Sequence, residues 1–289
     1  MIKVLYHILV ICALLTAASC NSEKKVHEST STTSKKKKQK GVVVTKYNKI
    51  LKHGDANAKL EAAIMYFEKE DYVKSITLLE SVISIFRGTK EEAKVRYYYA
   101  FSNYYIGDFI VAAYQFKTYV RNFPGGEHAE LCAYTQALCY FQSSPTYSLE
   151  QKDTYIAIDA FQHFLNKYPN SQYTEACNEK LDILRNKLVK KSYENSKLYY
   201  HMGLYKSAII AIENHIKDFS DSKYIEEMSY LILKSHYLLA INSIESKKNE
   251  RFKASIDSYL KFVNLFPNSI YIKDAEEIYT KSIKEYKST

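Results

Sequence analysis

The sequence repeats one short pattern four times between its middle and its end. Each copy places an aromatic residue before a Pro or Ser and closes with a Gly or Ser, at 123–126, 168–171, 219–222 and 266–269. This pattern predicts successive helices: the aromatic residue ends one helix, the Pro or Ser prevents its continuation, and the small residue starts the next. The spacings of 45, 51 and 47 residues indicate an internal structural repeat.

A second pattern lies inside the repeats and predicts short turns between paired amphipathic helices. The three clearest turns are Glu70-Asp71-Tyr72, Gly107-Asp108-Phe109 and Gly203-Leu204-Tyr205. A small residue follows each aromatic by three positions and a large apolar residue comes four later: Ser75 and Leu79, Ala112 and Phe116, Ala208 and Ile212. Two further pairs have the same spacing: Ala157 with Phe161, and Ser255 with Tyr259. The small residues would let paired helices approach closely.

This arrangement resembles the tetratricopeptide (TPR) consensus, although the chain has no Trp for the first consensus aromatic. Seven Gly and four Pro in 289 residues also favour helices over turn-rich sandwiches, barrels and Gly-loop folds. We expect an all-α, TPR-like α-solenoid of about five helix-turn-helix units and a C-terminal capping helix. The expected units are 57–88, 94–126, 128–171, 192–222 and 226–269, and the cap is 270–286. Insertions are expected at 143–153 and 242–250.

The first nineteen residues have the layout of a secretory signal. Lys3 supplies a short positive region, residues 4–15 are mostly apolar, and small residues lead up to Cys20. An apolar run of this length is too short for a bilayer-spanning helix, which needs about 20 residues. The small residues before Cys20 resemble a bacterial lipobox, which predicts cleavage after residue 19 and lipidation of Cys20. An ordinary signal peptide followed by chance by a Cys is the alternative.

The excess positive charge lies next to this signal. Residues 20–49 carry nine Lys and two Glu, so residues 50–289 hold only one of the nine net positive charges. A nucleic-acid binder places its basic residues on a folded face, and we therefore expect no nucleic-acid partner. Residues 20–45 are poor in apolar residues and predict a flexible Lys-rich tether before a solenoid at 46–289. The Lys run 35–38 either touches anionic lipid head groups or is a solvated spacer.

No signature of catalysis or metal binding occurs in the sequence. Gly-rich phosphate loops, Gly-x-Ser-x-Gly and His-Glu-x-x-His are absent, and the eight His lack ligands at metal-binding spacing. Cys132, Cys139 and Cys177 lie beside Ala or Leu on apolar stripes, which predicts buried, unreactive thiols. We expect no enzyme activity, no cofactor and no metal site.

The first helix of each TPR unit lines a concave binding surface. At the consensus groove positions of units 57–88 and 94–126, six of eight residues are apolar or aromatic. An exposed apolar stripe usually marks a binding site. The sequence therefore predicts a peptide-binding groove formed by Leu60, Ile64, Phe67, Tyr97, Phe101 and Tyr104. Alternatively, the stripe packs against residues 46–56 or completes the core.

Together these features resemble the BamD family, the TPR lipoproteins of the outer-membrane β-barrel assembly machinery. The most specific local likeness is at 168–174, followed by Lys187-Leu188 and 199–208. Residues 112–116 and the long last unit resemble family members with extended C-terminal repeats, and the resemblance covers 46–286. It implies a non-enzymatic scaffold, lipid-anchored on the periplasmic face of the outer membrane. It also implies that C-terminal units 128–286 bind POTRA domains of a BamA-like β-barrel protein. The N-terminal units 57–126 would receive unfolded outer-membrane protein segments.

Two other classes stay open from the sequence. One is a periplasmic TPR lipoprotein that scaffolds another envelope complex, such as cell-wall synthesis. The other is an enzyme built on a TPR-shaped scaffold. Asn21 after Cys20 favours the outer over the inner membrane, because Asp at that position is the retention signal in enterobacterial sorting.

Overall fold

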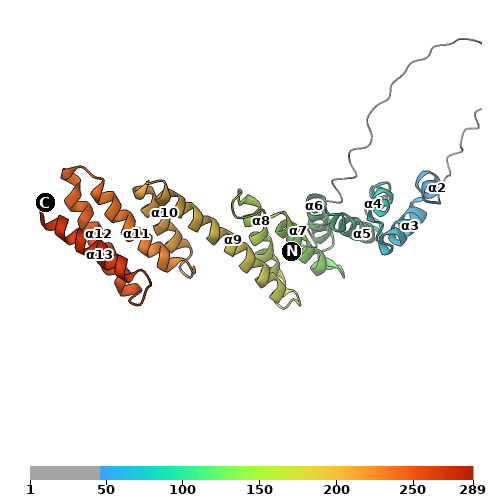
Figure 1. The fold of residues 1–289 in the computed structure, drawn as a ribbon. Coiled ribbons are helices and arrows are strands. Elements are labelled where there is room, and N and C mark those ends of the chain that lie inside the picture. The colour runs from blue at the N-terminus through green and yellow to red at the C-terminus, as the bar shows by residue number, and fades with distance from the viewer. Residues whose placement is uncertain (1–45, 289) are drawn as a thin grey trace, which may run out of the picture. The chain divides into compact units, whose positions relative to one another are not determined.

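The computed structural model describes residues 46–288, so the predicted signal at 1–19, Cys20 and the tether 20–45 lie outside the described residues. Within 46–288 the chain forms twelve α-helices and no strand (Figure 1). They are α2 (Lys46–His53), α3 (Ala56–Glu68), α4 (Tyr72–Glu80), α5 (Glu92–Tyr105), α6 (Phe109–Asn122), α7 (Ala129–Ser143), α8 (Lys152–Lys167), α9 (Thr174–His201), α10 (Tyr205–Asp218), α11 (Ile225–Ile241), α12 (Glu245–Leu265) and α13 (Ile272–Ser288). None of these helices is long and apolar enough to cross a bilayer. The predicted all-α class is confirmed for this part of the chain.

The helices pack in chain order. Five pairs lie side by side: α3 with α4, α5 with α6, α7 with α8, α9 with α10, and α11 with α12. The second helix of each pair also packs against the first helix of the next pair, and α13 packs against α12 and α11. Figure 1 shows this succession from α2 to α13. The stacking is consistent with the TPR-like solenoid, while the number of repeat units stays a prediction.

The small residues predicted to allow close helix approach are all fully buried. They are Ser75, Ala112, Ala157, Ala208 and Ser255, each with 0% of its surface exposed. The two serines also bond across to a neighbouring helix. Ser102 of α5 donates to Ser75 over 3.2 Å, and Ser255 bonds to Ser282 of α13 over 3.0 Å. A larger side chain at these positions would force the helices apart.

The large apolar residues four positions later form the centre of the core. Leu79, Phe116, Phe161 and Ile212 are fully buried. Burying an apolar side chain of this size contributes about 1.5–3 kcal/mol to folding. Tyr259, the fifth member of this series, is only partly buried and stacks on a tyrosine of α13.

Three of the turns inside the pairs contain one residue with a left-handed backbone, and in two of these turns an Asp caps the next helix. Gly107 and Gly203 have φ angles of +83° and +73°, and Glu70 occupies the same place in the first pair with φ +59°. Asp71 and Asp108 follow and cap α4 and α6, each accepting a hydrogen bond from the backbone N–H three residues later. A capping side chain of this kind contributes about 1 kcal/mol.

The turns between pairs carry the repeated aromatic residues at helix ends, as the sequence predicts. Phe123, Tyr168, Phe219 and Phe266 are the C-caps of α6, α8, α10 and α12. In the last three of these turns a Ser hydroxyl accepts a hydrogen bond from the backbone N–H of a Tyr two residues later. Each of these tyrosines stacks on a tyrosine of the preceding first helix. The stacked pairs are Tyr134–Tyr173, Tyr193–Tyr224 and Tyr230–Tyr271, with ring centroids 4.3, 3.9 and 4.4 Å apart.

The first helix of the fourth pair is longer than the predicted unit. The expected unit begins near residue 192, but α9 begins at Thr174 and runs unbroken for 28 residues. No Gly or Pro occurs between Thr174 and His201 to stop the helix. Residues 242–250 behave in a similar way, because most of the expected insertion there extends α12, which has 21 residues.

Candidate binding surfaces

The predicted groove residues fall into two adjoining parts of the core. Leu60 of α3 belongs to a buried cluster shared by α3, α4 and α5, and Ile64 packs against it. Phe101 of α5 belongs to the next cluster, and Phe67, Tyr97 and Tyr104 pack against that one. Leu60 and Phe101 are only 6% and 7% exposed. The other four are partly buried.

The aromatic residues of the predicted groove contact one another and their neighbours through their rings. The centroid of Phe101 lies 4.7 Å from that of Tyr97 and 4.8 Å from that of Phe116, in α6. Tyr105, the last residue of α5, lies 5.9 Å from Phe67 and 6.2 Å from Phe101. Such pairs add about 0.5–1.5 kcal/mol each beyond area burial. We call Phe67, Tyr97, Phe101, Tyr104 and Tyr105 the α3–α5 aromatic cluster.

The phenols of Tyr97 and Tyr104 stay neutral at physiological pH. Burial raises the pKa of Tyr97 to about 12 and also raises the pKa of Tyr104. The ring centroid of Tyr97 lies 4.5 Å from that of His128, just before α7. Part of the Tyr97 ring is therefore covered by a contact with the next helix pair. Tyr105, in contrast, is 53% exposed. The cluster therefore offers apolar contact area mainly at its edge, and the peptide groove stays a prediction.

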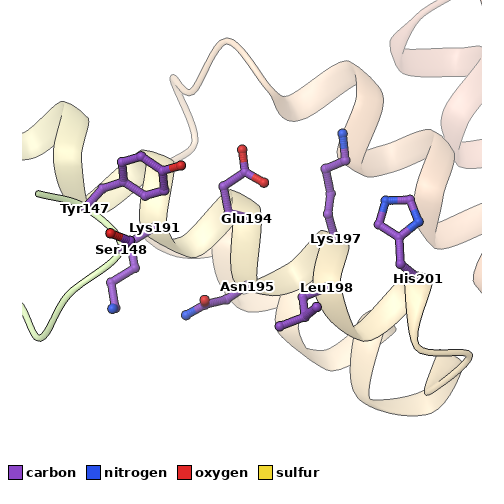
Figure 2. A pocket seen from close by; sticks show the side chains of 8 residues that line it. All are labelled: Tyr147, Ser148, Lys191, Glu194, Asn195, Lys197, Leu198 and His201. Atoms are coloured by element: carbon purple, nitrogen blue, oxygen red, sulfur yellow. The ribbon is translucent and has the colours of Figure 1, made fainter. Parts of the chain in front are cut away.

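A second candidate surface is a hollow of about 340 Å³ over α9 (Figure 2). Tyr147 and Ser148 of the α7–α8 loop form one wall. The remaining lining residues come from α9: Lys191, Glu194, Asn195, Lys197, Leu198 and His201. Figure 2 shows these side chains spread along the helix. The hollow is open and amphipathic, which suits a polypeptide segment better than a small enclosed ligand.

Two lysines of α9 hold the loop that forms this wall. Lys187 Nζ donates to the carbonyl of Ser144 over 3.2 Å and to its hydroxyl over 2.9 Å. Lys191 Nζ donates to the carbonyl of Leu149 over 2.7 Å. Partial burial lowers the pKa of Lys187. The predicted insertion at 143–153 thus contains the loop that forms one wall of the hollow over α9.

A polar network fixes the side of the hollow that faces α11. Tyr193 donates to Glu227 Oε2 over 2.7 Å, and Lys197 donates to both Tyr193 Oη and Glu227 Oε1, over 2.7 and 2.9 Å. Burial opposes ionisation of Glu227, but the hydrogen bonds from Tyr193 and Lys197 outweigh it and lower its pKa. The Tyr193 hydroxyl and Glu227 raise the pKa of Lys197. The network therefore stays ionised and orders α9 against α11.

Sequence reasoning did not place a binding surface at the hollow over α9. The available signals were the insertion at 143–153 and two Lys four residues apart, which share one helix face. Neither signal shows which carbonyl groups the ammonium groups reach, because these lie about 40 residues away in the chain.

The cysteines and the metal-binding residue types form no reactive site in the part of the chain that the structure describes. Cys132, Cys139 and Cys177 are free and buried, and burial raises their pKa values to about 12, 12 and 11. Thiols with such values are protonated and unreactive. Among residues 46–288, no three His, Cys, Asp or Glu lie together in a way that could hold a metal ion.

Comparison with known proteins identifies the family. The family described as "YfiO: Outer membrane lipoprotein" matches residues 52–250, from α2 into α12. A relative from Caulobacter vibrioides, named outer membrane protein assembly factor BamD, is 23% identical over 131 residues, 45% of this chain and 43% of that protein. A relative of the same name from Rickettsia prowazekii is 20% identical over 185 residues, 64% of this chain and 73% of that protein.

The match therefore spans less than half the length of the Caulobacter relative and about three quarters of the Rickettsia relative. The family match covers well over half of this chain and includes every helix from α3 to α11. The chain belongs to the YfiO family of outer membrane lipoproteins.

Proposed function

We propose that this protein is a non-enzymatic scaffold of outer-membrane protein assembly, anchored by lipid at Cys20 on the periplasmic face of the outer membrane. The observation that carries the proposal is the family match over the stacked helix pairs, together with two relatives named as assembly factors. Stacked helix pairs present extended surfaces to other polypeptides, which is the property a scaffold needs.

We propose that the C-terminal pairs bind POTRA domains of a BamA-like β-barrel protein. The supporting feature is the exposed apolar end of α9, beside the hollow over that helix. Leu198, Tyr199, Met202 and Leu204 are all exposed there. Neighbouring exposed apolar side chains in a soluble domain commonly mark a protein interface.

Clients would bind at the α3–α5 aromatic cluster. Unfolded barrel strands alternate apolar and polar residues, so they need apolar contacts at intervals. Tyr105 supplies an exposed ring that the rest of the cluster holds in place. Leu60 and Phe101 would support this surface from within the core and not touch the client.

Affinity purification of the tagged protein from its own cells tests the proposed function. Co-purification of a β-barrel protein with POTRA domains is the expected result. Recovery of cell-wall synthases without any such barrel would contradict it and favour the rival scaffold.

A Cys20→Ala variant tests the lipid anchor. The variant should move the protein from the membrane to the soluble fraction. Continued membrane attachment would contradict anchoring by lipid alone.

Tyr105→Ala tests the client surface without removing a core side chain. We expect about fivefold weaker binding of a peptide from the C-terminal strand of a barrel protein, the equivalent of about 1 kcal/mol. Tyr286→Ala is the matched control, because it removes an exposed tyrosine from α13. Equal affinity of the two variants in an anisotropy titration would rule out the α3–α5 aromatic cluster as the client surface.

A further inference from the structure

Two hollows away from the surfaces above meet at one arginine. The first, of about 510 Å³, lies between α5, α6 and the segment that follows α4. Arg87, Arg96 and Arg121 line it. The whole chain has only five arginines among its 41 basic residues, so three of the five gather in this hollow. Guanidinium groups are the side chains best suited to bind carboxylates in a paired geometry.

One of these arginines already has a partner. Arg96 Nε donates to Glu92 Oε1 over 2.6 Å, and both residues are buried. The second oxygen of Glu92 accepts from the backbone N–H of Gly88 over 2.7 Å. This backbone bond and the Arg96 bond lower the pKa of Glu92 despite its burial. Glu92 is therefore favoured as a carboxylate, and both of its oxygens are bonded inside the protein.

The other two arginines lack such a partner. Among residues 46–288, neither Arg87 nor Arg121 forms a direct ion pair with a carboxylate, although the charge of Arg87 also helps to lower the pKa of Glu92. The side chain of Arg121 donates only to its neighbour Asn122, over 3.4 Å. Both residues are exposed at the hollow. Two guanidinium groups thus remain available to an incoming anion.

The second hollow, of about 580 Å³, lies between α6 and α8 across α7, and Arg121 lines it too. Lys117 and Lys167 add two further cations, and Asp159 is its only carboxylate. The two hollows together have five Lys or Arg side chains and two carboxylates, leaving a charge of about +3. We call the joined hollows the Arg121 track.

Each hollow also contains a buried polar atom that has no hydrogen-bond partner. The two atoms are Oε1 of Gln115 in the first hollow and the hydroxyl of Tyr168 in the second. Only one other buried side-chain nitrogen or oxygen atom in residues 46–288 lacks a hydrogen-bond partner. Unpaired buried polar atoms are rare in folded proteins and call for a ligand or water. An amide and a phenol can pair with the N–H and C=O groups of a peptide backbone.

We propose that the Arg121 track binds an extended acidic segment of a partner protein. Arg87 and Arg121 would hold carboxylates of the segment, and Gln115 and Tyr168 would pair with its backbone. Apolar side chains between its acidic residues would lie against Ile83 and Ile156, which line the two hollows.

A polypeptide fits the Arg121 track better than a phosphate group. A single phosphate would occupy only one of the hollows and would leave the unpaired atom of the other without a partner. The track runs from the segment after α4 to α8 and shares no lining residue with the hollow over α9 or with the α3–α5 aromatic cluster. The proposal does not depend on the proposed function.

A fluorescent peptide of about twelve residues, with Glu alternating with Leu and Tyr, tests this proposal on the full chain. A peptide of that length spans about 40 Å when extended. The matched control peptide has Gln in place of every Glu. We expect the acidic peptide to bind at least tenfold more tightly than its Gln counterpart. Arg121→Gln should weaken its binding about tenfold, because the variant loses the charged group that would bond to a carboxylate of the peptide.

Arg185→Gln is the matched control variant, since it removes the same charge from an exposed arginine that pairs with Asp221. It should leave the affinity within twofold of the original. Circular dichroism of both variants checks that the helices are intact. Absence of binding, equal binding of the two peptides, or equal losses in the two variants would overturn the proposal. Displacement of the acidic peptide by millimolar inorganic phosphate or glycerol phosphate would overturn it as well, in favour of a phosphate site.

Discussion

Tyrosines join successive helix pairs through one repeated contact. In the last three turns between pairs, a serine hydroxyl fixes the backbone N–H of a tyrosine whose ring stacks on the preceding pair. His128 takes the same place against Tyr97 in the turn before α7. The chain has 28 Tyr and no Trp, and these stacks explain part of that bias. The repeated Ser-x-Tyr is visible in the sequence. The partner ring of each tyrosine is not, because it lies between 31 and 41 residues away in the chain.

A buried histidine lies beside one of these turns. His215 of α10 is fully buried, and its two ring nitrogens bond to the hydroxyls of Ser192 and Ser222 over 3.0 and 3.1 Å. Burial lowers its pKa from 6.5, although Asp218 opposes the shift. The folded state therefore disfavours the proton that the unfolded chain accepts near pH 6.5.

We predict that the protein loses stability as the pH falls below about 6.5, the ordinary pKa of the imidazole. The contribution of His215 is complete above that pH and decreases towards its lower folded pKa. Melting curves at pH 7.5 and pH 5.5 measure the loss. In His215→Gln the loss should be smaller, though not absent, because burial also lowers the pKa of His236. An identical loss in both proteins would contradict this role of His215.

At the scale of the helix pair, the turns and the small buried residues could be predicted, because each depends on residues close in sequence. The five small positions are all buried, as their spacing implies. The length of α9 could not be predicted from the repeat, because a helix without Gly or Pro continues until its packing ends. Which of the predicted groove residues are exposed could not be predicted either. A stripe of apolar residues has the same sequence pattern whether it faces solvent or the next helix pair.

The first turn carries a local conflict that the other turns avoid. Glu70 has a left-handed backbone where the later turns have glycine. A side chain costs about 1–2 kcal/mol in this conformation. Apart from Gly107 and its two neighbours in the chain, no residue has an atom within 4 Å of the position that a Cβ would occupy on Gly107, so only the backbone conformation opposes a side chain there.

We therefore predict opposite effects for two substitutions at equivalent turn positions. Glu70→Gly should raise the free energy of unfolding by up to about 1 kcal/mol, and Gly107→Ala should lower it by about 1–2 kcal/mol. Urea unfolding followed by circular dichroism measures both. Changes of the same sign would show that contacts other than the backbone conformation dominate at these turns.

The α7–α8 loop depends on the lysines of α9 in a testable way. Lys187→Met keeps the apolar stem but removes the ammonium group that bonds twice to Ser144. We expect faster amide hydrogen exchange in residues 145–150, because the loop loses these bonds. Lys180→Met is the control: both ammonium groups lie near the ring of Phe141, but only Lys187 has a hydrogen bond to the loop. Equal exchange in the two variants would mean that Lys187 does not hold the loop.

At the scale of the whole molecule, the all-α class and the family could be predicted from the sequence. The repeat and the low Gly and Pro content indicated the class, and the lipobox-like residues before Cys20, the number of units and residues 168–174 together indicated the family. The hollow over α9 and the Arg121 track could not be predicted, because each combines side chains from separate helices. Arg87 and Arg121, for example, are 34 residues apart and line one hollow only because the segment after α4 lies close to α6.

One measurement tests the proposed role in outer-membrane protein assembly most directly. Cells depleted of this protein can be pulse-labelled, and the fraction of newly made β-barrel proteins that reaches the folded, heat-modifiable form can be followed. We predict that this fraction falls sharply while other exported proteins still reach the periplasm. Normal barrel folding during depletion, with or without a defect in the cell wall, would contradict the proposed function.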